Sequence, residues 1–293
     1  MKPAPFDYAC PDSVDEAVAL LAEHLGNAKV IAGGQSLMPM INFRVVKPAL
    51  LVDIGRLLEL DFLRATADGG VCIGALTRHR VLETSPLIAE RFPVVSEAMR
   101  HVAHVAIRNR GTIGGSLSHA DPAAELPMLA LLLDADITTH SPRGERTIAA
   151  ADFFVGALTN ALADDELVVR VDLPGLRPGT GWAFEEFARR AGDYAIAAVA
   201  MLLHVGDGVI DDARIAMMGV GDAPLRRHAA ESILMGQRLD DDAVMKAAIA
   251  AACDDLRPNQ DLQASPEYRR HLAAMLCERV FADAWQRANP ETP

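Results

Sequence analysis

The sequence predicts an α+β protein built from two domains of unequal size. Its 293 residues are usually too many for one compact core. The stretch GLRPGTG (175–181) holds three glycines and one proline in seven residues, which is typical of a linker. Short apolar runs and turns precede it, and Ala-rich segments follow. We therefore predict a front domain over residues 1–175, with subdomains over about 1–55 and 56–175, and a smaller α+β domain over residues 178–290.

The first elements of the front domain follow from helix-start signals and apolar runs. Ser13 with Glu16 three residues later forms a capping box, apolar residues then recur at helical spacing, and Gly26 ends that helix. Short apolar runs bounded by turn residues predict strands. The segment 77–102 predicts a helix, a break at Pro86 and a second helix. The predicted strands cover residues 28–34, 49–57 and 70–76.

The remaining elements follow in the same way. A glycine turn and an acidic loop precede an apolar helix over Leu126–Leu133, and Asp121-Pro122 is a good helix entry. Pro142, Arg143 and Gly144 predict the turn of a hairpin. The last elements are a strand over Glu166–Pro174, mixed strand or helix elements to about residue 239, and an almost wholly helical end over Asp240–Asn289.

Composition limits the function classes. The chain has 28 basic and 40 acidic residues, so its formal net charge of −12 argues against a nucleic-acid partner. We find no apolar leader and no run long enough to cross a bilayer, so we expect a cytoplasmic protein without an integral membrane segment. The cysteines lack metal-type spacing, which predicts neither an iron–sulfur cluster nor zinc in this chain but buried or half-buried thiols. They are Cys10, Cys72, Cys253 and Cys277.

Two glycine motifs are the strongest functional signals. AGGQS (32–36) and GTIGGS (111–116) each follow an apolar run and each end in serine. Glycine lets a ligand approach the backbone closely, and successive N–H groups in such a turn form a concave anion site. Neither motif fits the P-loop or the Rossmann fingerprint. Two such loops could together hold one extended ligand that carries two phosphates.

Other polar residues have simpler interpretations. His101 and His104 lie three apart on a predicted helix but lack a carboxylate or Cys partner, so a metal site is disfavoured. His119 and Asp121 could serve acid–base chemistry, but a loop that caps the next helix or contacts a ligand is favoured. Tyr194 is by default a core aromatic. The acidic runs 164–166 and 240–242 are interpreted as solvated charge or helix caps.

The longer segments around the motifs resemble a known family. IAGGQSLMPMINFRVVKPALLVDIGRL and IRNRGTIGGSLSHADPAAELP are similar to the two FAD-binding segments of the medium, flavoprotein subunit of molybdenum hydroxylases, of the carbon monoxide dehydrogenase and xanthine dehydrogenase type. PAPFDYACPDSVDEAVALL and RRAGDYAIAAVA also fit. The resemblance covers essentially the whole chain. It implies an FAD-binding domain of two α+β subdomains, like that of vanillyl-alcohol oxidase (PCMH-type), followed by a C-terminal α+β domain.

The resemblance also implies which residues bind the cofactor. The first motif would hold the FAD pyrophosphate, Glu125 stands where the family usually has an Asp that contacts the cofactor, and Tyr194 would lie against the isoalloxazine ring. No catalytic residue and no metal ligand is implied. The implied FAD-binding residues are Ala32, Gly33, Gly34, Gln35, Ser36, Leu37, Gly111, Thr112, Ile113, Gly114, Gly115, Ser116, Ser118, Asp121, Glu125 and Tyr194.

The sequence departs from the family pattern at a few positions. Gln35 stands where the carbon monoxide branch commonly has His, and Ser116 where Asn is common. Glu185 and Glu186 occupy a place where a basic residue often precedes the later Arg pair. FAD binding depends mostly on backbone amides, so the expectation of a flavin stands, whereas substrate and electron acceptor are less well defined.

As implied by the resemblance, the chain is an electron-transfer subunit that takes electrons from an iron–sulfur subunit and passes them through FAD to a quinone, NAD⁺, O₂ or another acceptor. A molybdopterin large subunit would oxidise the substrate, and the 2Fe–2S clusters would belong to a small subunit. The expected assembly is a dimer of heterotrimers. Two alternatives stay open, a free-standing flavin oxidoreductase with its own small-molecule substrate and an assembly protein that has lost FAD. The substrate of the complex also stays open among carbon monoxide, a purine, an aldehyde and an N-heterocycle.

Overall fold

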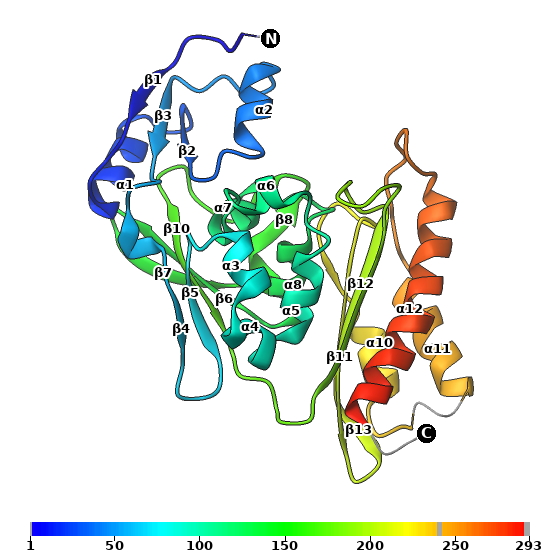
Figure 1. Ribbon diagram of the computed structural model, residues 1–293. Coiled ribbons are helices and arrows are strands. Elements are labelled where there is room, and N and C mark those ends of the chain that lie inside the picture. Colours follow the sequence, from blue (N-terminus) through cyan, green and yellow to red (C-terminus); the bar gives the residue numbers. More distant parts are fainter. Residues whose placement is uncertain (1, 239–241, 290–293) are drawn as a thin grey trace.

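The computed structural model describes residues 2–238 and 242–289 and confirms the predicted α+β class (Figure 1). The chain begins with a small parallel sheet in the order β1-β3-β2, in which Val30 of β2 lies opposite Val52 of β3. Ser13 caps the first helix by accepting from the Glu16 N–H, as predicted. The strands and helices of this part are β1 (Asp7–Ala9), α1 (Val14–Glu23), β2 (Ala28–Ile31), α2 (Leu37–Asn42) and β3 (Leu50–Asp53).

A second, antiparallel sheet follows in the order β4-β5-β10-β6-β7. Its β6–β7 hairpin turns at the predicted place, between Ser141 and Gly144. A two-stranded hairpin follows α9. The strands are β4 (Leu63–Ala65), β5 (Val71–Gly74), β6 (Asp136–Ser141), β7 (Gly144–Ala149), β8 (Phe154–Gly156), β9 (Thr159–Asn160) and β10 (Leu167–Leu173).

Short helices pack beside this second sheet (Figure 1). The predicted helix pair over 77–102 is in fact three helices, because Pro93 starts a new helix just as Pro86 does. The helices of this region are η1 (Leu58–Leu60), α3 (His79–Thr84), α4 (Pro86–Arg91), α5 (Pro93–Met99), α6 (Val105–Arg108), α7 (Ile113–His119), α8 (Glu125–Leu132) and α9 (Ala150–Phe153).

The last part is a four-stranded antiparallel sheet between two layers of helices (Figure 1). One face packs with α5 and α8 through residues such as Phe184 and Met218, and the other face packs with the C-terminal helices through residues such as Met217 and Phe281. Every residue of α8 is buried, as its apolar run requires. The elements are β11 (Gly181–Phe187), β12 (Ala197–Gly206), β13 (Val209–Met218), β14 (Leu225–Arg226), α10 (His228–Leu234), α11 (Asp242–Cys253) and α12 (Pro266–Ala288).

The C-terminal end differs partly from the prediction. Residues 254–265 form a connection between α11 and α12, so the end predicted as almost wholly helical contains a twelve-residue non-helical segment. Asp240 and Asp241, predicted as solvated charge or caps, lie outside the described residues. All four cysteines are free thiols, with Cys277 buried and the others half-buried, as expected. Within residues 2–238 and 242–289, no helix has the length and apolar character needed to cross a bilayer.

Candidate flavin site

The first glycine motif forms a turn with free backbone donors. It connects the end of β2 at Ile31 to the start of α2 at Leu37. Gly34 has a φ of +72°, which favours glycine, and the Gln35 side-chain amide donates to the Gly33 carbonyl at 2.8 Å. Within the described part of the chain, the backbone N–H groups of residues 33–36 have no hydrogen-bond acceptor. Since backbone donors are rarely left unpaired, this turn has the character expected of an anion site.

The second motif lies directly against the first. A Cβ built on Gly33 would lie 2.2 Å from the carbonyl oxygen of Arg110 and 3.0 Å from the Cα of Gly111. The Arg110 Nε also donates to the Gly33 carbonyl at 3.5 Å, across 77 residues of sequence. No side chain fits at position 33 without a backbone shift. The fold therefore brings the two motifs together, and the missing Cβ of Gly33 is what permits their contact.

The second motif is a helix start and not the predicted glycine turn. Thr112 caps α7 by accepting from the Gly115 N–H at 3.1 Å. The N–H groups of Ile113 and Gly114 are bonded to the carbonyls of residues 77 and 75, at 3.1 and 2.9 Å. A Cβ on Gly114 would lie 2.7 Å from that of Ala75, so this glycine serves helix–strand packing. The N–H groups of Ile113, Gly114 and Gly115 are therefore already paired with protein acceptors.

Position and exposure decide what α7 can offer a ligand. Thr112, Ile113 and Gly114 are buried, Gly115 is exposed, and Ser116 is half-buried. Ser118 is also half-buried, and its carbonyl accepts from the Asn160 amide at 2.6 Å. Contacts from this helix to a cofactor would therefore come from the surface near its first turn. The half-buried residues that flank Gly33 in the first motif are Ala32, Gly34, Gln35, Ser36 and Leu37.

A second group of predicted site residues meets beyond the end of α7. Tyr194 is 58% exposed, so the default interpretation as a core aromatic is wrong. The pKa of its hydroxyl is raised by partial burial and by the carboxylates of Asp121 and Glu125. The structure thus brings these three residues together. His119 Nε2 lies 4.0 Å from Asp121 Oδ2.

Asp121 caps a turn and not a helix. Its Oδ1 accepts from the Ala123 N–H at 2.9 Å, and α8 begins only at Glu125, so Pro122 is not the first helical residue as predicted. His101 and His104 do not share a helix, because α5 ends at Met99 and His104 is the N-cap of α6. No cluster of metal-binding side chains occurs among the residues that the structure describes.

Glu125, which is buried, and Glu186, which is half-buried, form an acid pair between α8 and β11. Burial raises the pKa of Glu125 to about 8, and the neighbouring Glu186 and Asp121 raise it further than Arg108 lowers it. Burial raises the pKa of Glu186 to about 7, against a lowering hydrogen bond from Glu125. Glu186 Oε2 is buried without a partner among the described residues. At neutral pH the pair therefore retains a proton.

This acid pair should make stability depend on pH. An unfolded Glu titrates near 4.3, so the folded chain binds more protons between about pH 4.5 and 8, and stability falls as pH rises through that window. We expect Glu186→Gln, which stays neutral, to raise the Tm at pH 8.5 by roughly 3 °C and to flatten the slope between pH 5 and 8.5. The neighbouring Glu185→Gln, which removes a partner of Arg279 at 3.4 Å, is the control. Equal slopes in all three proteins, measured by thermal melts, would contradict the assignment.

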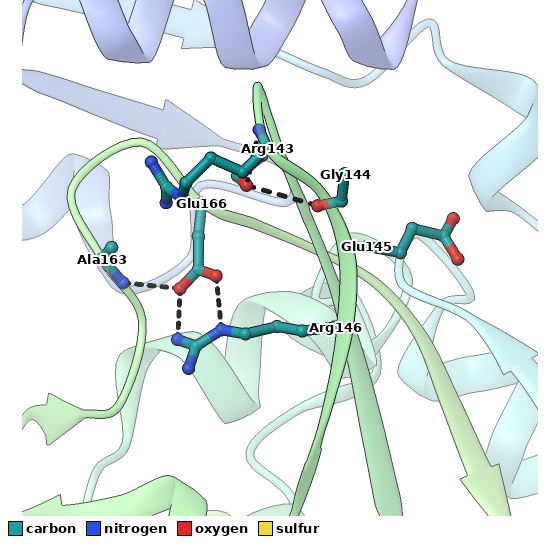
Figure 2. Close-up of a pocket in the computed structure, with 7 residues that line it drawn as sticks. Arg143, Gly144, Glu145, Arg146, Ala163 and Glu166 are labelled. Atoms are coloured by element: carbon teal, nitrogen blue, oxygen red, sulfur yellow. Dashed lines mark hydrogen bonds and ion pairs between the residues drawn. The ribbon is translucent and has the colours of Figure 1, made fainter.

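A separate cavity lies at the β6–β7 hairpin. Its volume is about 400 Å³, and none of its lining residues, which Figure 2 draws as sticks, belongs to the predicted flavin site. Arg143 donates to Asp165 at 2.5 and 2.8 Å, and Arg146 donates to Glu166 at 2.6 Å. The carboxylates thus neutralise the arginines. Asp165 and Glu166 are buried in these ion pairs, so their interpretation as solvated charge is wrong.

Sequence reasoning missed two residues that support the second motif. Arg108 is buried and binds Glu83 on α3, and His79 lies beneath Gly111. Arg108 and Glu83 are 25 residues apart and His79 and Thr112 are 33 apart, so neither pair has a spacing that the local sequence reveals. His79 lies between Arg78 and Arg80, so its local sequence gives no signal of burial or of a supporting role.

Two family models together match most of the chain. The model for the FAD-binding domain in molybdopterin dehydrogenase matches residues 4–176. The model for the C-terminal domain of the CO dehydrogenase flavoprotein matches residues 182–284.

Relatives of similar length support the same relationship. The chain is 45% identical to the alpha subunit of the 6-hydroxypseudooxynicotine dehydrogenase complex of Paenarthrobacter nicotinovorans, with 99% of this chain and 98% of that protein covered. It is 41% identical to the beta subunit of caffeine dehydrogenase of Pseudomonas sp. (strain CBB1), with 98% and 97% covered. A solved carbon monoxide dehydrogenase chain of Hydrogenophaga pseudoflava superposes with a TM-score of 0.95 at 37% identity, covering 98% of this chain and 99% of that one.

Proposed function

Because the chain belongs to the family of FAD-binding medium subunits of molybdenum hydroxylases, we propose that it is the electron-transfer subunit of a multi-subunit oxidoreductase. It takes electrons from an iron–sulfur partner and delivers them to an external acceptor. FAD supplies the redox chemistry when bound, and this chain binds and orients it. The observation that carries the proposal is the turn with free N–H groups at residues 33–36, set against Gly111.

The FAD pyrophosphate is assigned to the turn 32–36, where unpaired amides and positive backbone dipoles favour an anion. Gly33 keeps the second motif close, and Ser116 and Gly115 contribute the outer surface of α7. The isoalloxazine ring is assigned to Tyr194, with Asp121 and Glu125 beside it. The remaining predicted residues of the two glycine motifs, together with Ser118, act through their backbone or support the residues that contact FAD. They are Ala32, Gly34, Gln35, Ser36, Leu37, Gly111, Thr112, Ile113, Gly114 and Ser118.

The assembly is proposed to contain an iron–sulfur small subunit and a molybdopterin large subunit, in a dimer of heterotrimers. The names of the relatives support a complex, since one is a complex subunit and another is a medium chain, and this chain spans almost their full length. The oxidised substrate would then meet the large subunit and not this chain. We place the complex in the cytoplasm, where thiols stay reduced, because the four cysteines are free. Residues 178–290 are proposed as the C-terminal domain and residues 1–175 as the FAD-binding domain.

Isolation of the native complex through a tag on this chain tests the proposal. We expect two further chains to co-purify, with FAD, iron and molybdenum in fixed ratios to this chain. Reduction by substrate should bleach the flavin only when all three chains are present. A flavin-containing single chain that oxidises a small molecule without iron or molybdenum would favour the free-standing oxidoreductase instead. An assembled complex whose medium chain holds no flavin would contradict both.

A further inference from the structure

His79, the first residue of α3, lies beneath the second glycine motif. It is 7% exposed, and its Nε2 lies 3.0 Å from the carbonyl oxygen of Thr112. A carbonyl only accepts, so Nε2 carries the hydrogen of the neutral ring. Nδ1 is buried and has no partner among the described residues. The backbone N–H of His79 adds a bond to the Gly111 carbonyl at 2.9 Å.

Gly111 covers the imidazole ring directly. A Cβ built on Gly111 would lie 2.8 Å from both Nδ1 and Cε1 of His79, so the ring packs against a bare Cα. The preceding Arg78 donates from Nη1 to the carbonyl of Arg110. That same carbonyl oxygen is the atom that faces Gly33. The start of α3 thus contacts the Arg110–Gly111 peptide, which faces the turn 33–36.

The ring stays uncharged in this place. Burial lowers the pKa of His79 to about 4, and the charges of Arg108 and Arg78 act in the same direction, against the raising bond to Thr112. A neutral ring offers one donor and one covered acceptor at physiological pH. The contact with Thr112 is therefore made by the neutral ring at physiological pH.

We propose that His79 is a positioning residue for the FAD site. Its Nε2–H fixes the Thr112 carbonyl, and its ring supports Gly111, which together set the separation between residues 110–112 and the turn 33–36. The inference rests on the proposed function, because the ligand that would contact both segments is FAD. His79 itself need not contact the cofactor.

FAD titration of the deflavinated full chain, and of the assembled complex, tests the inference. His79→Leu keeps an apolar side chain of similar size but removes the donor to Thr112, and we expect about five- to tenfold weaker FAD binding. His79→Gln can place an amide N–H near the Nε2 position and should restore most of the affinity. His24→Leu is the matched control, because His24 Nδ1 also lies 3.0 Å from a backbone carbonyl, that of Leu20 within α1, and its side chain has no hydrogen bond to either glycine motif among the described residues.

The thermal stability of the flavin-free variants separates positioning from general support of the fold. The inference predicts that His79→Leu and His24→Leu lose similar stability, while only His79→Leu loses FAD affinity. Wild-type FAD affinity in His79→Leu would overturn the inference. An affinity in His79→Gln as low as in His79→Leu would also overturn it. Failure of the wild-type chain and complex to bind FAD would remove the proposed function and this inference together.

Discussion

Gly33→Ala is expected to abolish FAD retention. The added Cβ would lie 2.2 Å from the carbonyl oxygen of Arg110 and 2.7 Å from its carbonyl carbon, distances that no side-chain rotation can relieve. The backbone of the turn or of residues 110–111 must move apart. Overpacking of this kind typically costs about 1–3 kcal/mol, and the displaced turn would no longer face the second motif. We expect FAD binding to weaken by about 100-fold, while the chain stays folded.

Fluorescence titration with FAD measures this effect, and Gly156→Ala is the matched control. Gly156 lies in β8 without a positive φ, and a Cβ there would meet no atom within 4 Å. The control should bind FAD like the wild type. If Gly33→Ala binds FAD as tightly as Gly156→Ala does, then contact between the two motifs is not required for the site.

Arg108→Met is expected to cause the largest loss of stability. The guanidinium is buried, with Nε and Nη2 donating to the Glu83 carboxylate at 2.8 and 3.2 Å and Nη1 donating to the carbonyls of Val102 and Ala103 at 2.8 and 2.9 Å. Burial acts to raise the pKa of Glu83, but hydrogen bonds from Arg108 and Arg80 lower it below its usual value. Without Arg108, the mostly buried Glu83 carboxylate keeps only the partly exposed Arg80 and two carbonyls lose a donor, which costs about 3–5 kcal/mol. FAD affinity should fall as well, since Arg108 is the first residue of the segment that leads to Gly111.

Arg80→Met provides an internal control for this prediction. Arg80 pairs with the same Glu83 oxygen at 2.9 Å, but its side chain is 44% exposed, compared with 8% for Arg108. Exposed pairs contribute at most about 1 kcal/mol. Urea unfolding of both variants should therefore give clearly different midpoints. Similar midpoints would show that burial of Arg108 does not govern the energetics of this segment.

Local signals in the sequence were enough to predict much of the fold. The capping box at Ser13, the hairpin turn before Gly144 and the apolar run of α8 each depend on residues within one element. β1 and α2 escaped prediction because each is short and gains its stability from neighbours, as β1 does from its pairing with β3. Short elements of this kind are fixed by tertiary contacts and not by propensity.

The site was predictable in part, for a related reason. The first motif is the expected turn with free amides. The glycine pair predicted this turn correctly, because Gly34 adopts a positive φ there. The second motif looked similar in sequence, but its glycines serve the cap of Thr112 and the close approach of Gly114 to Ala75. A Gly-Gly pair indicates that the backbone comes close to something. Whether that neighbour is a ligand or another strand depends on contacts that only the fold supplies.

A crystal structure of the chain with bound FAD tests the central claim most directly. We expect the diphosphate within hydrogen-bond distance of the backbone N–H groups of residues 33–36, on the side that faces Gly111, and the isoalloxazine ring beside Tyr194. A diphosphate bound elsewhere, for example at the hairpin cavity beside Arg143 and Arg146, with the amides of residues 33–36 left to solvent, would contradict it.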